Sequence, residues 1–174
     1  MRSAVFSLAL AAALAAADGP RFTSDGQLVF PRDYREWVFV TSGLGMSYSA
    51  DASTHEPRFD NVFVTRAAYQ SFLEKGSWPD GTMFILEVRA SESKASINKD
   101  GRFQSGIEGI EAEVKTSGKW AFYGFGKGSA TAKQIPASAN CYSCHSEHGA
   151  VDNTFVQFYP TLLSVAKAKG TLRQ

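Results

Sequence analysis

The sequence predicts an α+β fold, consisting mainly of an antiparallel β-sheet with a few flanking helices. Three consecutive segments, 82–89, 107–115 and 119–125, have the composition and periodicity of strands. Only Ser117-Gly118 and its neighbours separate the last two, and so short a connection joins antiparallel strands. Helical patterns occur before and after these strands, so we expect the helices on one side of the sheet or at its end.

The N-terminal part of the domain is predicted to contain one short helix between irregular segments. Residues 18–30 mix Gly, Pro and polar residues and are expected to be extended. Residues 31–38 have a proline at their start and apolar residues at helical spacing, which predicts a helix. Residues 41–45 should break it, and 49–58 should form a polar loop in which His55 is solvated.

The next segments predict a strand, a helix and a turn. Residues 59–64 are rich in β-branched and aromatic side chains, which favours a strand. Thr65 is expected to cap a helix over 66–75, and Gly76 is expected to end it. Trp78-Pro79-Asp80-Gly81 has the proline and glycine positions of a β-turn.

The central strands differ in how much of their surface is apolar. The first half of 82–89 is apolar at every position, so it should be buried on both faces. A polar stretch with a turn at 99–101 leads to 107–115, which alternates between two faces. One face of that strand carries Ile110, Ala112 and Val114, and the other carries Glu111, Glu113 and Lys115.

The C-terminal part follows a small, polar segment over 126–140. A final helix is predicted that includes Phe155, Phe158, Leu162 and Leu163. Asp152 or Asn153 could cap this helix, and Pro160 should disturb or kink it.

The first 17 residues have the pattern of a cleavable secretory signal. Arg2 supplies a positive charge, an apolar alanine-rich run follows, and Ala17 marks the expected cleavage site. The run is about 14 residues long, shorter than the roughly 20 that span a bilayer. We therefore expect export to the periplasm, and a single domain over 18–174 with no membrane span. The net charge of +1 does not favour binding to nucleic acid.

The chemically informative motif is Cys141-Tyr142-Ser143-Cys144-His145. Two cysteines separated by two residues, followed at once by histidine, are the attachment signature of a c-type haem. Cys141 and Cys144 would bind the porphyrin covalently, near the C-terminus, and His145 would be the axial ligand of the iron. A redox dithiol, half of a zinc site and a disulfide are the alternatives, but the chain has no further cysteine for a second zinc-ligand pair. The 13 phenylalanines suit a core built against one large flat cofactor.

A sixth iron ligand is not evident in the sequence. A low-spin electron carrier needs a second strong ligand, usually methionine or histidine. Met83 opens an apolar strand and is expected in the core, whereas Met46 lies in a loop and could reach the iron. His148 follows His145 by three residues, so on a helix it would share the same side of the haem. An open iron site is therefore favoured.

Several stretches together resemble the cytochrome P-460 family, which also contains the cytochromes c′-beta. They are the turn and strand from Trp78, the Glu111/Glu113 strand, the aromatic strand 119–125, and the haem motif with the segment that follows it. The resemblance covers about residues 34–163. It implies a mainly β, homodimeric periplasmic protein with one haem c, whose open iron binds nitric oxide or oxidises hydroxylamine. A redox partner protein is possible.

Departures from the family pattern shape the expected pocket. The resemblance implies that hydroxylamine-oxidising members carry a porphyrin-linked lysine in the strand after the turn, but 82–89 contains none, which weakens the case for hydroxylamine oxidation. The lysines nearby in sequence are expected to be solvated: Lys94, Lys99, Lys115 and Lys119. Glu111 and Glu113 are candidate distal carboxylates that would accept protons, unless their face is simply exposed to water. Phe63, Phe84 and Leu86 are candidates for the haem pocket, with ordinary core packing as the alternative. An electron-transfer cytochrome with six-coordinate iron and a gas sensor or store without turnover remain alternative functions.

Overall fold

The computed structural model describes residues 19–46 and 56–173, and it has an α+β fold. The predicted signal at 1–17 and His55 lie outside the described residues. In chain order the elements are β1 (Leu28–Val29), the 3-10 helix η1 (Tyr34–Glu36), β2 (Val38–Leu44), β3 (Phe59–Val64), α2 (Arg66–Lys75), β4 (Met83–Glu92), β5 (Phe103–Thr116), β6 (Lys119–Phe125), β7 (Thr131–Ala132), α3 (Asn140–His148), the 3-10 helix η3 (Val156–Phe158) and α4 (Pro160–Lys169).

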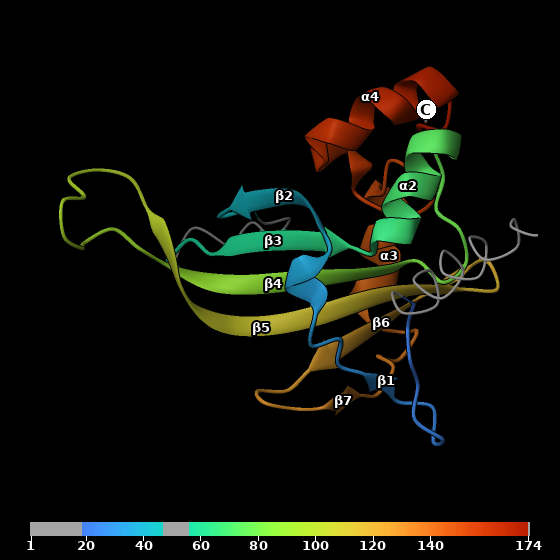
Figure 1. Ribbon diagram of the computed structural model, residues 1–174, viewed down its shortest axis with the longest axis horizontal. Helices are drawn as coiled ribbons and strands as arrows, with labels where there is room; N and C mark the ends of the chain where they lie inside the picture. Colours follow the sequence, from blue (N-terminus) through green and yellow to red (C-terminus); the bar gives the residue numbers. More distant parts are fainter. Residues whose placement is uncertain (1–18, 47–55, 174) are drawn as a thin grey trace, which may run out of the picture.

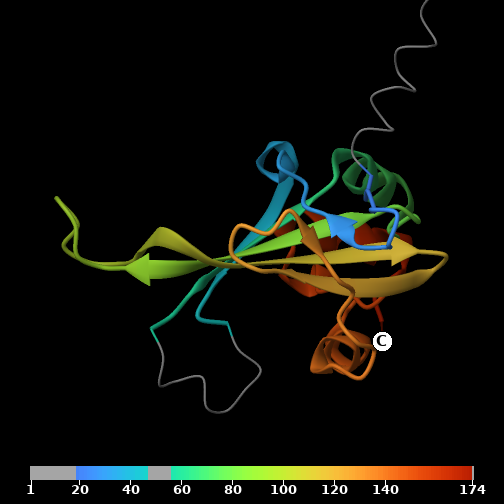
Figure 2. The ribbon, with the colours of Figure 1, turned by 90° about the horizontal axis from the view of Figure 1, so that it is seen from below.

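The main sheet has five antiparallel strands in the order β2-β3-β4-β5-β6. Ser117 and Gly118 both have positive φ, 50° and 73°, and form the predicted tight turn between β5 and β6. The hairpin of β4 and β5 extends beyond the rest of the sheet as a long arm (Figure 1 and Figure 2). A second sheet of two strands pairs β1 with β7. No helix in the described part of the chain is long and apolar enough to cross a membrane.

Two apolar clusters cover opposite faces of the main sheet. One joins α2, α4 and the segment before α4 to Phe84 and Trp120 of the sheet. The other joins the N-terminal segment, β1 and β7 to Ile85 and Val114. Side chains alternate between the faces of a strand, so neighbouring residues such as Phe84 and Ile85 enter different clusters. Figure 1 shows α2 and α4 together above the sheet and the pair β1–β7 below β6.

The predicted helix over 31–38 is wrong beyond a single turn. Only Tyr34–Glu36 is helical, as a 3-10 turn, and β2 begins at Val38. The break predicted at 41–45 lies inside this strand, which pairs with β3 through an irregularity between Phe39 and Thr41. Pairing with a distant strand overrides the local Ser-Gly signal here, because the ladder satisfies the backbone hydrogen bonds of both strands.

The predictions for α2 and for the three strands after it are confirmed, and β4 and β5 are longer than expected. Gly76 ends α2 in the left-handed conformation, with φ 73°. Thr65 is the residue before α2, but its side chain makes no capping hydrogen bond. Strand β4 continues to Glu92, and β5 begins as early as Phe103.

The C-terminal prediction needs correction in three respects. Phe155 and Phe158 lie outside the final helix, since α4 begins only at Pro160 and Phe158 ends the separate turn η3. Pro160 occupies the first position of α4, where its missing N–H costs nothing, so it begins that helix and does not kink it. Asp152 and Asn153 cap no helix; both have positive φ and form a turn between α3 and η3.

Candidate haem site

Helix α3 carries the two cysteines and the histidine of the motif. Cys141 and Cys144 are both partly buried and are not joined in a disulfide. They are three residues apart on a helix, which puts their side chains on one face, and His145 follows directly. Burial and the nearby charge of Glu147 raise the pKa of the Cys144 thiol, whereas redox-active cysteines have a lowered pKa.

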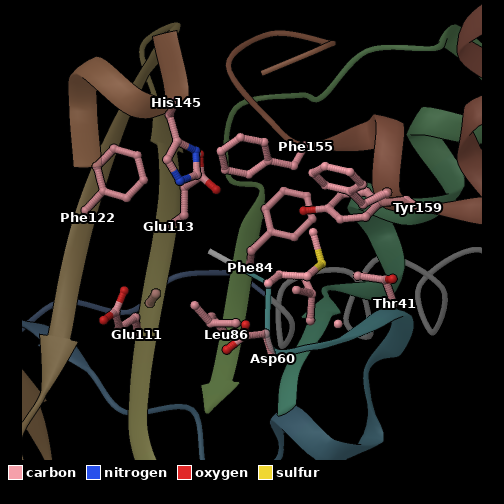
Figure 3. A pocket seen from close by; sticks show the side chains of 15 residues that line it. Thr41, Asp60, Phe84, Leu86, Glu111, Glu113, Phe122, His145, Phe155 and Tyr159 are labelled. Atoms are coloured by element: carbon pink, nitrogen blue, oxygen red, sulfur yellow. The ribbon is translucent and has the colours of Figure 1, made fainter. Parts of the chain in front are cut away.

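His145 points from α3 into a pocket on one face of the main sheet (Figure 3). Its ring lies between two phenylalanines, with centroid distances of 4.6 Å to Phe122 and 4.5 Å to Phe155. The pocket is lined mainly by apolar and aromatic side chains, among them Val62, Phe84, Leu86, Phe122, Phe155 and Tyr159. An apolar pocket with few polar groups is typical of a site for a small ligand or cofactor.

A backbone carbonyl determines which nitrogen of His145 carries the proton. Nδ1 of His145 lies 2.9 Å from the carbonyl oxygen of Asn153. A carbonyl oxygen can only accept a hydrogen bond, so Nδ1 is the donor and Nε2 keeps its lone pair. Ligands of metals commonly have this second hydrogen bond, which fixes the orientation of the ring and its tautomer.

Glu113 lies directly beside the imidazole. Its Oε1 is 3.3 Å from Nδ1 of His145, and the residue is only 8% exposed. Oε1 accepts no hydrogen bond, because the Nδ1 proton is directed to Asn153. The contact between Glu113 and His145 is therefore electrostatic. Burial raises the pKa of Glu113. Burial lowers the pKa of His145, but Glu113 and the Asn153 carbonyl outweigh it and raise that pKa overall.

Two more carboxylates lie at the end of the pocket away from His145 (Figure 3). Glu111 is on β5 beside Leu86 of β4, and Asp60 is on β3. Burial raises the pKa of Asp60, and the charge of Glu111 adds to this, against the opposing effect of Arg58. Glu111 itself is exposed, so it borders the open side of the pocket.

Comparison with protein families then identifies the chain. The family model of cytochrome P460 matches residues 31–156, more than half of the sequence. The chain belongs to the cytochrome P460 family. Membership implies a haem cofactor. A comparison with curated proteins finds no match.

The residues present fit the haem that a cytochrome P460 protein requires. His145 offers an unprotonated Nε2, two cysteine thiols lie on the same helix, and the pocket below is lined by aromatic rings. Elsewhere, no three His, Cys, Asp or Glu side chains of the described residues come together in a way that could hold a metal ion.

Not every predicted pocket residue lies in this cytochrome P460 pocket. Phe84 and Leu86 line it, but Phe63 does not. Phe63 pairs with Ile85 across the strands, so it lies on the opposite face, where its ring packs edge-on against Tyr34 and Phe39. The prediction for Phe63 is therefore wrong. The strand pattern shows which residues share a face, but it does not show which face borders the pocket.

The two predicted carboxylates are at different depths of the pocket. Glu113 contacts His145 itself, whereas Glu111 lies two residues earlier on β5. Of the two, Glu111 is therefore the better candidate for a carboxylate that lies across the pocket from His145. Asp60 is a pocket residue that the sequence did not predict, although its position on the same strand face as Val62 and Val64 was an available signal.

The remaining candidates have defined positions. Met83 belongs to the core, as predicted, and is 1% exposed. Met46 borders the pocket. Lys115 was expected to be solvated, but its side chain is 13% exposed, and Nζ contacts Asp152 Oδ2 at 2.5 Å and the Trp78 carbonyl at 2.7 Å. It is therefore held by protein groups and is not directed into the pocket.

Proposed function

We propose that this protein is an exported cytochrome with one c-type haem, whose open iron site binds or oxidises small nitrogen species. Cys141 and Cys144 hold the haem covalently near the C-terminus, and His145 is its axial ligand. The observation that carries the proposal is the imidazole of His145, which lines an apolar pocket while its Nδ1 is engaged by the Asn153 carbonyl. Nitric oxide and hydroxylamine are the ligands that the family resemblance suggests.

Each group of pocket residues has a separate task in this proposal. When bound, the haem supplies an iron that takes up the ligand and can accept its electrons. Phe84 and Leu86 restrict the pocket to small ligands by their size and low polarity. Oxidation of hydroxylamine releases protons as well as electrons, and Glu111 with Asp60 supplies carboxylates that accept them.

Ligand binding is favoured over rapid turnover of hydroxylamine. Hydroxylamine-oxidising relatives are expected to have a porphyrin-linked lysine, but strand β4 contains no lysine. Lys115, on the neighbouring strand β5, does not replace it, because it is engaged by Asp152 and Trp78. A protein that senses or stores nitric oxide fits the same pocket without any turnover.

An electron-transfer cytochrome is the second candidate function. Met46 supports it, because this exposed methionine borders the pocket that His145 enters, and a thioether would complete a six-coordinate iron. In that case the iron would have no open position for nitric oxide.

The setting of the protein is part of the proposal. Residues 1–17 would direct export and be removed, leaving a single haem domain over 18–174 in the periplasm, where covalent haem attachment takes place. The mature chain would form a homodimer and exchange electrons with a partner protein, without binding nucleic acid.

An absorption spectrum of the reduced, haem-loaded protein, followed by addition of nitric oxide, tests the function. We expect haem that stays with the denatured chain, an ordinary Soret position and tight binding of nitric oxide. The double variant Cys141→Ala/Cys144→Ala should lose the covalently attached haem. A low-spin ferric spectrum that Met46→Leu converts to high-spin would instead establish the electron carrier. Mass spectrometry checks the cleavage after Ala17, and light scattering checks the dimer.

Hydroxylamine with an artificial electron acceptor tests turnover in the same preparation. Fast acceptor reduction would contradict a pure binding role. Glu111→Gln should then slow the reaction by about 10²-fold, as expected for loss of a general base, without changing the affinity for nitric oxide.

A further inference from the structure

We propose that the turn from Val151 to Thr154 is a clamp that positions His145, and that Lys115 holds this turn against the sheet. The inference rests on the proposed role of His145 as the iron ligand. It assigns to Lys115 and Asp152 a positioning role, since neither is directed at the ligand. The clamp would set how strongly the imidazole donates to the iron.

The turn has a backbone conformation that few residues adopt. Asp152 and Asn153 have φ of 49° and 60°, the pattern of a type I′ turn, and Val151 and Thr154 pair on either side of them. The Thr154 amide donates to the Val151 carbonyl at 2.8 Å. Aspartate and asparagine tolerate the left-handed region better than other side chains. In this turn the Asn153 carbonyl accepts the hydrogen bond of His145.

An ion pair ties the tip of the turn to strand β5. Nζ of Lys115 lies 2.5 Å from Oδ2 of Asp152 and donates to the carbonyl of Trp78 at 2.7 Å. Lys115 and Glu113 are two residues apart, so they lie on the same face of β5. The ion pair therefore connects the strand that carries Glu113 to the turn that carries the Asn153 carbonyl.

A second, buried contact ties the base of the turn to the same region. The indole Nε1 of Trp78 donates to Thr154 Oγ1 at 2.8 Å, and that hydroxyl donates to the Val151 carbonyl at 2.7 Å. Thr154 is fully buried, and Trp78 is 2% exposed. The tip of the turn is thus fixed to Lys115 at the end of β5, and its base is fixed to Trp78 before β4.

The backbone at Gly149, directly after α3, packs closely against the turn and prevents it from moving toward the helix. A Cβ at this position would lie 2.5 Å from the carbonyl carbon of Asn153 and 2.6 Å from its Cα. Helix α3 and the turn are therefore in direct backbone contact at the residue that binds His145. With the sheet on one side and Gly149 on the other, the Asn153 carbonyl has one position relative to the imidazole.

The strength of the Nδ1 hydrogen bond controls the electron density at Nε2. A firm bond from Nδ1–H raises the basicity of the ligand nitrogen, and a loosened bond lowers it. Release of the clamp should therefore weaken the bond between iron and histidine and raise the reduction potential. A lysine that served only stability would change neither property.

The test compares variants of the haem-loaded protein by reduction potential and by resonance Raman spectroscopy of the iron–histidine stretch. Lys115→Met and Asp152→Asn should both lower the stretching frequency and raise the potential. Gly149→Ala should do the same, because the added Cβ would crowd the Asn153 backbone as well as the carbonyl of His145. Glu56→Gln removes an ion pair between the exposed Glu56 and Arg102, neither of which borders the pocket, and should leave both properties unchanged.

Asn153 provides a matched pair of variants. Asn153→Gly keeps the carbonyl and tolerates positive φ, so the spectra should remain those of the wild type. Asn153→Val places a β-branched residue at φ 60°, and its spectra should resemble those of Lys115→Met. Wild-type frequency and potential in both Lys115→Met and Asp152→Asn would overturn the inference.

Failure of the proposed function would be visible separately. If the wild-type protein has no histidine-ligated haem, that proposal is wrong, and the clamp is then judged by ¹⁵N NMR of His145 in the haem-free protein. A proton fixed on Nδ1 in the wild type and mixed tautomers in Lys115→Met would support the clamp. Identical tautomers in both proteins would overturn it.

Discussion

Among single residues, Glu87 is a buried charge held by several partners on the face of the sheet opposite the pocket. Its side chain is 3% exposed. It accepts hydrogen bonds from the Tyr34 hydroxyl and from the guanidinium groups of Arg35 and Arg89, the latter two at 2.5 Å. Burial raises the pKa of Glu87, but these partners outweigh it and lower the pKa from 4.5 to about 2.

Replacement of this carboxylate should cost stability in a pH-dependent way. Because the folded state lowers the pKa of Glu87, its contribution is complete above about pH 4.5 and is lost as the pH falls toward about 2. We expect Glu87→Gln to lower the free energy of unfolding by about 2 kcal/mol at pH 7, as for lost hydrogen bonds to charged groups. Chemical denaturation at pH 7 and pH 3 should show the difference narrowing at the lower pH. An equal difference at both would contradict this assignment.

Residue identity alone predicts the Cys-x-x-Cys-His motif as a unit, but it does not predict the pocket around it. Cys141, Cys144 and His145 are defined by their spacing, so the sequence could predict them as a group. The surroundings of Glu113 could not be predicted, because its contact with His145 joins β5 to α3 through tertiary packing. Asn153 contributes a backbone carbonyl, which no side-chain pattern reveals.

At the scale of elements, local signals served well wherever neighbouring segments in sequence also pair in space. The hairpin of β5 and β6 follows from alternation and a tight turn, and the structure confirms it. Strand β2 was missed because its Thr-Ser-Gly segment resembles a helix break, and its partner β3 begins only after the 47–55 segment. An edge strand depends on its single partner strand more than on its own composition.

The junction between α2 and α4 should be sensitive to one methyl group. Gly76 has φ +73°, and a Cβ there would lie 2.6 Å from Cβ of Lys169 at the end of α4. Gly81 has φ +84°, but nothing lies within 4 Å of such a Cβ. We expect Gly81→Ala to cost about 1 kcal/mol through backbone strain, and Gly76→Ala about 1–3 kcal/mol more through overpacking.

Thermal and urea unfolding of the two glycine variants would measure these costs. The shared left-handed conformation makes Gly81→Ala the control for strain, so the difference between the variants reports crowding at α4. Equal losses would mean that α4 moves aside without cost.

At the scale of the whole molecule, helix α3 is less buried than the sheet. Helix α3 has no fully buried residue, whereas the first three residues of β4, Met83, Phe84 and Ile85, are at most 3% exposed. Of its side chains, His145 lines the pocket and Tyr142 packs edge-on against Phe122, so we expect a bound haem to add to the stability of this helix. Segments with few buried apolar contacts open locally before the core does.

Loss of the haem should therefore loosen one part of the molecule selectively. In hydrogen-exchange mass spectrometry, the haem-free Cys141→Ala/Cys144→Ala variant should exchange faster than the loaded wild type over α3 and 151–158. Protection in β4 should change much less, because its contacts lie within the sheet. Uniformly faster exchange would show instead that the haem is needed for the whole fold.

The fold class could be predicted from the sequence because alternation and helical spacing are local. The arrangement of the two sheets could not, since Leu28 of β1 pairs with Ala132 of β7 from the other end of the domain. Two-residue strands carry no periodicity of their own, and only the closed fold brings them together.

Strand β5 has a consequence for how such proteins diverge in evolution. Glu111 and Glu113 border the pocket, while Ile110 and Val114, the residues on either side of this pair, pack in the opposite core. Mutations at alternate positions of one strand are therefore exposed to different selection, one set by ligand chemistry and the other by folding. A lineage can exchange its pocket carboxylates for other side chains while it inherits the same scaffold.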